Sequence, residues 1–78
     1  MNIELRLVGR LKEYRQSQEP LEVSAGVSVT QVLALIGIPD DEAGMVAVNG
    51  TSISRKDRPN QQLEEGDSMT VLAPVHGG

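Results

Sequence analysis

Residues 28–39 read Ser-Val-Thr-Gln-Val-Leu-Ala-Leu-Ile-Gly-Ile-Pro and contain the main helix that the sequence predicts. Ser28 lies three residues before Gln31, which is the spacing of a capping box. Four apolar side chains then recur at i, i+3, i+4 and i+7 and form one stripe of a helix: Val29, Val32, Leu33 and Ile36. Gly37 suits the C-terminal cap, and Pro39 blocks continuation. A helix of about two turns is not stable alone, so we expect it to cover a β-sheet.

The segments on both sides of this helix predict the strands of that sheet. Residues 2–8 alternate in character, with Ile3, Leu5 and Leu7 on one face, as a half-buried strand does. Further strands are predicted at residues 20–24, 45–48, 51–54 and 68–73. Asn49-Gly50 predicts a type I′ turn between the third and fourth strands. The first two strands should form a hairpin with a long polar connection, which has room for a helical turn.

This order of elements predicts an α+β fold, with a mixed sheet of four to five strands and one main helix on one face. We expect the first and last strands to lie side by side and parallel, because both are apolar and central. That is the β-grasp (ubiquitin-like) arrangement. Residues 1–74 should form this domain, and residues 75–78 should form a flexible C-terminal Gly-Gly tail.

The composition of the 78-residue chain excludes several classes of function. With 7 basic and 11 acidic residues the net charge is −4, which argues against binding to nucleic acid or to an anionic membrane. The chain has no cysteine and one histidine, so a disulfide framework, a Cys-ligated zinc site and a His-rich metal site are ruled out. No apolar run approaches the roughly 20 residues that span a bilayer, and the first residues lack a signal-peptide core. We therefore expect a cytoplasmic protein.

The last two residues, Gly77 and Gly78, are the candidate site. Pro74 already ends the last strand, so the two glycines are not needed to terminate it. A Gly-Gly end can enter a channel too narrow for any side chain and leaves the terminal carbonyl open to attack. The Gly78 carboxylate is ionised at neutral pH and must be activated before it can transfer a group, as adenylation by ATP would do. Because the chain has no P-loop motif, another protein must perform that activation.

Four stretches of the chain match the pattern of a known family: Val46-Ala47-Val48-Asn49-Gly50, Leu63-Glu64-Glu65-Gly66-Asp67, Val71-Leu72-Ala73-Pro74 and Val75-His76-Gly77-Gly78. In this order, on a β-grasp pattern, they resemble the ubiquitin-like sulfur carriers. These include the small subunit of molybdopterin synthase (MoaD) and the thiamine-pathway carrier (ThiS). The Asn-Gly turn alone is weak evidence, whereas Leu-x-x-Gly-Asp, a strand and a terminal Gly-Gly together are fairly specific.

The resemblance implies a protein co-substrate and not an enzyme. An E1-like enzyme, using ATP and Mg, would adenylate Gly78, and a sulfur donor would convert the adenylate into a thiocarboxylate. The sulfur would then pass to a synthase subunit that is MoaE-like or ThiG-like. In this reading Gly78 carries the sulfur, Gly77 provides access, and the chain itself binds no cofactor and no metal. The missing cysteine agrees with a sulfur held at the C-terminus.

The sequence contains features of two biosynthetic pathways that use such carriers. The long first loop and Ala-Pro-Val before His-Gly-Gly favour molybdenum cofactor biosynthesis, whereas Ile53-Ser54-Arg55 after the turn favours thiamine biosynthesis. We favour the molybdopterin type. Two departures from its pattern are the single Pro74 without nearby aromatic residues, and His76 where a small or uncharged residue is usual. We interpret His76 as a solvated tail residue or a partner contact.

Two other functions fit the same sequence: a ubiquitin-like modifier conjugated to lysines through Gly78, and a non-catalytic β-grasp module that binds a partner through its sheet. An uncovered apolar face near the tail would serve for docking, and Leu5, Leu7, Val71 and Leu72 are its candidates. The basic residues Arg55, Lys56 and Arg58 are interpreted as a solvated loop or a contact for an acidic partner. The acidic runs at 40–42 and 64–67 are interpreted as solvated turns or as surfaces that steer a basic partner.

Overall fold

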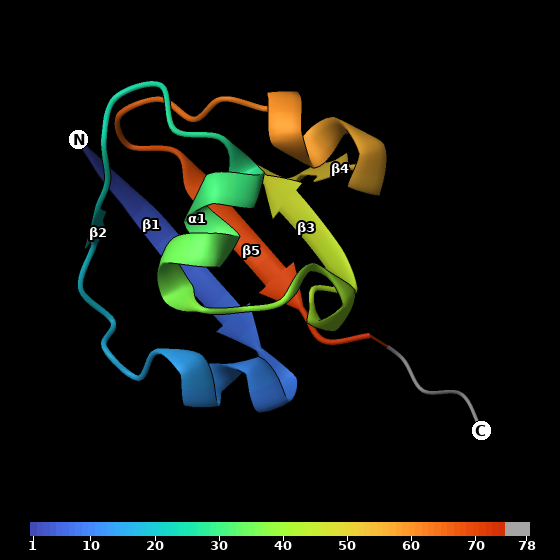
Figure 1. The fold of residues 1–78 in the computed structure, drawn as a ribbon. Coiled ribbons are helices and arrows are strands. Elements are labelled where there is room, and N and C mark those ends of the chain that lie inside the picture. Colours follow the sequence, from blue (N-terminus) through green and yellow to red (C-terminus); the bar gives the residue numbers. More distant parts are fainter. Residues whose placement is uncertain (75–78) are drawn as a thin grey trace.

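The computed structural model describes residues 1–74 and confirms the predicted α+β arrangement (Figure 1). One α-helix, α1 (Val29–Ile36), crosses one face of a five-stranded sheet. The strands are β1 (Asn2–Val8), β2 (Leu21–Glu22), β3 (Met45–Val48), β4 (Thr51–Ile53) and β5 (Ser68–Leu72). Short 3₁₀ helices lie in the connections: η1 (Gly9–Tyr14), η2 (Asp40–Glu42) and η3 (Arg55–Asn60).

The sheet has the order β2-β1-β5-β3-β4, so the last strand lies in its centre. β1 and β5 are parallel, from the pair Glu4–Ser68 to the pair Val8–Leu72, as the sequence predicts. The other neighbouring strands are antiparallel. The core lies between α1 and the sheet and includes Ile3, Leu7, Val29, Val32, Leu33, Val46, Met69 and Val71. Its helical part confirms the predicted stripe, except that Ile36 is only half-buried.

Both ends of α1 are closed as predicted. The Ser28 hydroxyl accepts a hydrogen bond from the Gln31 amide at 3.1 Å, and the Gln31 side chain accepts one from the Ser28 amide at 2.8 Å. Gly37 adopts a left-handed conformation, with φ 90°, and its amide donates to the carbonyls of Leu33 and Ala34. A helix this short depends on such caps, since each contributes about 1 kcal/mol.

The two interior stretches that carry the family resemblance hold each other in place. Asn49 and Gly50 both have positive φ, as a type I′ turn requires. The Asn49 side chain donates to Asp67 at 2.9 Å and accepts from the Ser68 amide at 2.9 Å, while Asp67 also accepts from the Glu64 amide at 2.8 Å. Asp67 is therefore a half-buried structural residue, and its interpretation as a solvated or steering residue is wrong.

The strand predicted at 20–24 is shorter than expected. β2 comprises Leu21–Glu22 and pairs with β1 only at Asn2 and Ile3. Val23 still exchanges two backbone hydrogen bonds with Met1, each at 2.7 Å, although neither residue is part of a strand. On the side of β1 that faces away from β5, the residues after Ile3 have no paired strand in the described part of the chain.

The interpretation of residues 55–58 as a solvated basic loop is wrong for Arg58. η3 packs beside α1, and Arg58 within it is only 2% exposed. Its Nη1 donates to the Asp40 carboxylate at 3.1 Å and lies 3.4 Å from the Asp40 carbonyl oxygen. Arg55 pairs with the other carboxylate oxygen of Asp40 at 3.6 Å. Asp40 thus neutralises a buried cation and is not the freely solvated residue that the acidic run suggests.

We expect Asp40→Asn to destabilise the fold much more than Asp41→Asn. The first change keeps the side-chain size but removes the counter-charge of a buried guanidinium, which should lower the free energy of unfolding by about 1–3 kcal/mol. The second removes an equal charge from an exposed position next to it and should cost less than about 0.5 kcal/mol. Urea denaturation of both variants measures the difference, and equal midpoints would contradict the assigned role of Asp40.

Candidate functional site

The predicted site residues Gly77 and Gly78, together with His76, lie outside the described residues, and their roles stay predictions. The structure describes how the chain approaches them. β5 ends at Leu72, and Ala73 and Pro74 follow it, both half-buried. In Figure 1 the chain leaves the sheet at the same end as η1 and η2. A central strand therefore delivers the C-terminal segment from the middle of the sheet.

The end of β5 is held from both sides. Leu72 is opposite Val8 of β1 and Met45 of β3. Beyond this last pair, the Gly44 amide donates to the Leu72 carbonyl at 2.8 Å. The backbone is thus fixed up to the point where Ala73 begins.

An apolar row crosses the end of the sheet face opposite α1. We use this name for Val8, Leu72 and Met45, which share one face by strand register. Val8 is 39% exposed, Met45 is 51% exposed, and Leu72 between them is half-buried. The row lies directly before Ala73 and Pro74, so an apolar surface and the start of the tail are adjacent.

The next row on this face is mostly polar and contains one alanine. Arg6, Thr70, Ala47 and Ser52 are aligned across β1, β5, β3 and β4. Arg6 forms an ion pair with Glu4 at 3.4 Å, but both side chains are more than 60% exposed, so the pair contributes little to stability. A partner that covers the apolar row would therefore meet hydrogen-bonding groups at its border.

The sequence identified this face only in part. Among its candidates Leu72 lies on it, whereas Leu7 and Val71 are buried in the core and Leu5 is half-buried on the α1 side. Val8 and Met45 were not among the candidates. The alternation of residues 2–8 does place Val8 on the face opposite Leu7, whereas Met45 begins an apolar run, 45–48, in which no polar residue marks the faces. The period-2 pattern of β5, extended to its neighbours by register, is the signal that could have found them.

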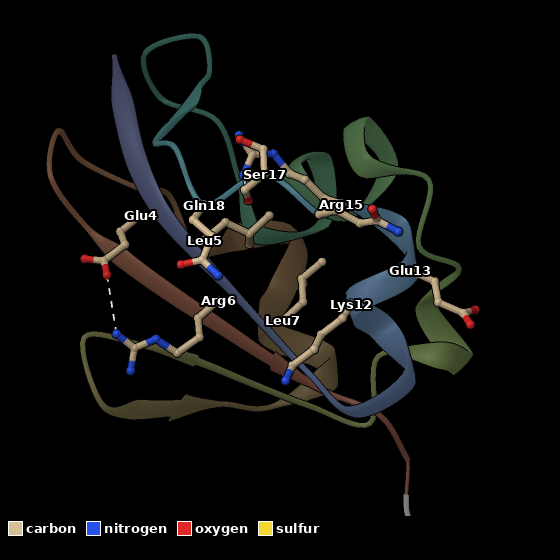
Figure 2. Close-up of a pocket in the computed structure, with 10 residues that line it drawn as sticks. Glu4, Leu5, Arg6, Leu7, Lys12, Glu13, Arg15, Ser17 and Gln18 are labelled. Atoms are coloured by element: carbon tan, nitrogen blue, oxygen red, sulfur yellow. Dashed lines mark hydrogen bonds and ion pairs between the residues drawn. The ribbon is translucent and has the colours of Figure 1, made fainter.

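A hollow of the described surface lies elsewhere, between β1 and the segment that includes and follows η1 (Figure 2). It has a volume of about 590 Å³, and Leu5, Leu7, Lys12 and Arg15 are among its lining residues. None of the lining residues belongs to β5 or to residues 73–74. The hollow follows from the short β2 and is not built around the start of the tail.

Residues 1–74 contain no group of three or more His, Asp or Glu side chains arranged to hold a metal ion. In the same part of the chain, no helix is long and apolar enough to cross a membrane.

Solved structures with the same fold come from several organisms. The solution structure of the HVO 2177 protein from Haloferax volcanii has 26% identity and a TM-score of 0.78, covering all of this chain and 87% of that one. The crystal structure of the thiamine biosynthesis protein ThiS from Geobacter metallireducens has 21% identity and a TM-score of 0.72, with both chains fully covered. A putative molybdopterin converting factor, subunit 1, from Pyrococcus furiosus has 22% identity and a TM-score of 0.70, covering 96% and 99%. Most of these identities are low enough to show the fold alone, which is the ubiquitin-like β-grasp.

A comparison with curated proteins gave no match. A family model gives the assignment instead, because the model of the ThiS family matches residues 5–78, which is nearly the whole chain and includes the Gly-Gly end. The chain therefore belongs to the ThiS family, the ubiquitin-like sulfur carriers that its sequence resembles.

Proposed function

We propose that this chain is a sulfur carrier protein whose terminal residue, Gly78, holds the transferred sulfur as a thiocarboxylate. The observation that carries the proposal is the central, parallel position of β5, which sends the chain out of the sheet beside the apolar row just before the Gly-Gly end. The match to the ThiS family across residues 5–78 supports it.

The proposed chemistry needs two steps, both performed by partners. A Gly78 carboxylate oxygen attacks the α-phosphorus of ATP and releases pyrophosphate, which gives an acyl adenylate. Sulfide-level sulfur then attacks the acyl carbon and displaces AMP, leaving a thiocarboxylate. The chain contributes an accessible carbonyl, because neither Gly77 nor Gly78 has a side chain to obstruct the attack. In this role it is a co-substrate and not a catalyst.

The first partner in this scheme is an E1-like adenylating enzyme, and the apolar row is its docking surface. Met45 and Val8 are exposed apolar side chains at the base of the tail, so a partner that covers them also receives the tail. Burial of these side chains would supply binding free energy close to the point where the tail must enter the partner. The polar row beside them would set the register of the complex.

The acceptor is a synthase subunit of the molybdopterin or the thiazole type. The long first loop and the Ala73-Pro74 strand end are the grounds for the molybdopterin type. The family model carries the ThiS name, and the structural neighbours carry both names. Reconstitution with a MoaE-like and a ThiG-like subunit in parallel separates the two, since only the true acceptor should discharge the thiocarboxylate.

The direct test of the proposal is mass spectrometry of the intact chain after incubation with the adenylating enzyme, Mg-ATP and sulfide. We expect a mass increase equal to the replacement of one oxygen by one sulfur atom, located on Gly78. A chain extended by one alanine beyond Gly78 should stay unmodified, because its carboxylate is displaced from the reactive position.

Two observations in cells would favour the alternatives. Isopeptide-linked species of higher mass in cells, without a thiocarboxylate, would indicate a protein modifier. Unchanged cellular function after deletion of Gly77 and Gly78 would indicate a module that binds only through its sheet. Equal modification of the wild-type and extended chains would contradict the role of Gly78.

The docking surface can be tested with a charged substitution in the apolar row. We expect Met45→Asp to raise the KM for the carrier in the adenylation reaction about tenfold, since it would bury a carboxylate in an apolar contact. Leu35→Asp is the matched control, because Leu35 is an exposed apolar residue (61%) on α1, away from this face. Its KM should stay within about twofold of the wild-type value. Equal effects of the two substitutions would contradict docking at the apolar row.

A further inference from the structure

We infer that Gly44 fixes the direction in which the C-terminal segment leaves the sheet, and that it is a positioning residue for activation of the tail. Gly44 lies between η2 and β3, thirty residues before Pro74. A Cβ atom at position 44 would lie 2.5 Å from the Pro74 Cα, 2.6 Å from the Pro74 nitrogen and 3.0 Å from the Ala73 carbonyl carbon. All three are backbone atoms, so no side-chain rotation could relieve the contact.

The need for glycine here is one of space and not of backbone conformation. Gly44 does not have a positive φ, so residues with a side chain could adopt its backbone conformation. Gly26 is the opposite case: it has φ +79° and nothing within 4 Å of the position of its Cβ. A side chain is therefore excluded at position 44 because the backbone of residues 73–74 runs directly beside it.

The surroundings of Gly44 decide whether residue 44 or residues 73–74 would move if a side chain were added. The Gly44 amide is bonded to the Leu72 carbonyl, and Met45 after it begins β3. Ala43 before it is fully buried, and its amide donates to the carbonyl of Asp40, the residue that holds Arg58. Residue 44 is thus anchored on both sides. Ala73 and Pro74 follow the last strand, so they would move instead.

The size of that movement is sufficient to affect a reaction at the chain end. Ordinary contact begins at 3.4 Å, whereas the closest distance would be 2.5 Å, so Pro74 would have to shift by roughly 1 Å. A misplacement of this order can slow a reaction that depends on orientation by up to about 100-fold. The shift would also move Pro74, the last described residue before the segment that carries the reactive carboxylate. This step rests on the proposed function, because it takes Gly78 as the reacting group.

The test compares Gly44→Ala with Gly26→Ala in ATP–pyrophosphate exchange, using the E1-like enzyme that adenylates the wild-type chain. We expect Gly44→Ala to lower kcat about tenfold or more, while KM stays within about threefold because the apolar row remains in place. Gly26→Ala introduces strain at a distant position without touching residues 73–74, so its kcat should equal the wild-type value. A kcat for Gly44→Ala equal to that of Gly26→Ala, with both variants folded, would overturn the inference.

A second variant covers the case in which Gly44→Ala does not fold. Pro74→Gly adds no atom at the contact but releases the fixed φ of the exit residue, so it should also lower kcat with little change in KM. Wild-type kcat in Pro74→Gly would then overturn the inference.

A structural measurement separates this inference from the proposed function. If the wild-type chain shows no adenylation at all, the proposed function fails, but the direction of the exit can still be measured by NMR. The amide resonances of Ala73 and Val75 should shift in Gly44→Ala and stay in place in Gly26→Ala. Unshifted resonances in Gly44→Ala would overturn the inference whatever the activity.

Discussion

The parallel pairing of β1 and β5 is the interaction on which the rest of this structure depends. It joins the two ends of the domain, from Glu4 opposite Ser68 to Val8 opposite Leu72, and such a long closure has a high entropic cost. Burial of apolar side chains from both strands offsets that cost: Ile3, Leu7, Met69 and Val71. A parallel pair also requires a crossover, and that crossover contains α1 and the β3–β4 hairpin. The fold is therefore built around a last strand that lies in the middle of the sheet.

This arrangement has a consequence for a chain whose C-terminus reacts. An edge strand would leave its end free on one side, whereas β5 ends between β1 and β3. Its continuation must pass Gly44 at a distance that no side chain could occupy. Under the proposed function, the absence of side chains is needed at two places for different reasons. At Gly44 it lets the segment leave the sheet, and at Gly77 and Gly78 it would let the segment enter a partner.

Local patterns predicted the elements well, because their signals lie within a few residues. Ser28 and Gln31 contact each other as their spacing suggests, and Asn49-Gly50 forms the predicted turn. The parallel pairing was also predictable, since apolar alternation at both ends of a short chain leaves few other places for these strands. What failed were contacts between distant residues. The charge of Arg58 suggested exposure, and only the packing of η3 beside α1 shows that it is buried.

The residues of the candidate site also differ in whether their evidence is local in the sequence or depends on distant contacts. Gly77 and Gly78 are predicted from their position in the chain and their chemistry, and they stay a prediction because they lie outside the described residues. Gly44 could not, because it lay within an apparently acidic loop and the segment that it contacts is thirty residues away. The face on which Met45 lies could not be predicted for a similar reason: residues 45–48 are all apolar, yet Val46 is fully buried while Met45 is 51% exposed. Exposure on a strand alternates between faces, and a short apolar run does not show which face is covered.

The acidic character of the chain also has a different meaning once the contacts are known. Asp40 holds Arg58 and Arg55, Glu42 pairs with Arg10 at 3.5 Å, and Glu65 accepts from the Asn2 amide. With Asp67 bonded to Asn49, much of both acidic runs is committed to contacts inside the domain. A partner that relied on Asp40 or Asp67 would have to compete with contacts inside the domain, whereas the exposed Glu42–Arg10 pair contributes little to stability. Recognition through the apolar row has no such cost, because Val8 and Met45 are exposed and give up only contact with water. Charge would then affect how fast a partner arrives, while the sheet face and the direction set at Gly44 would decide whether the tail is delivered productively.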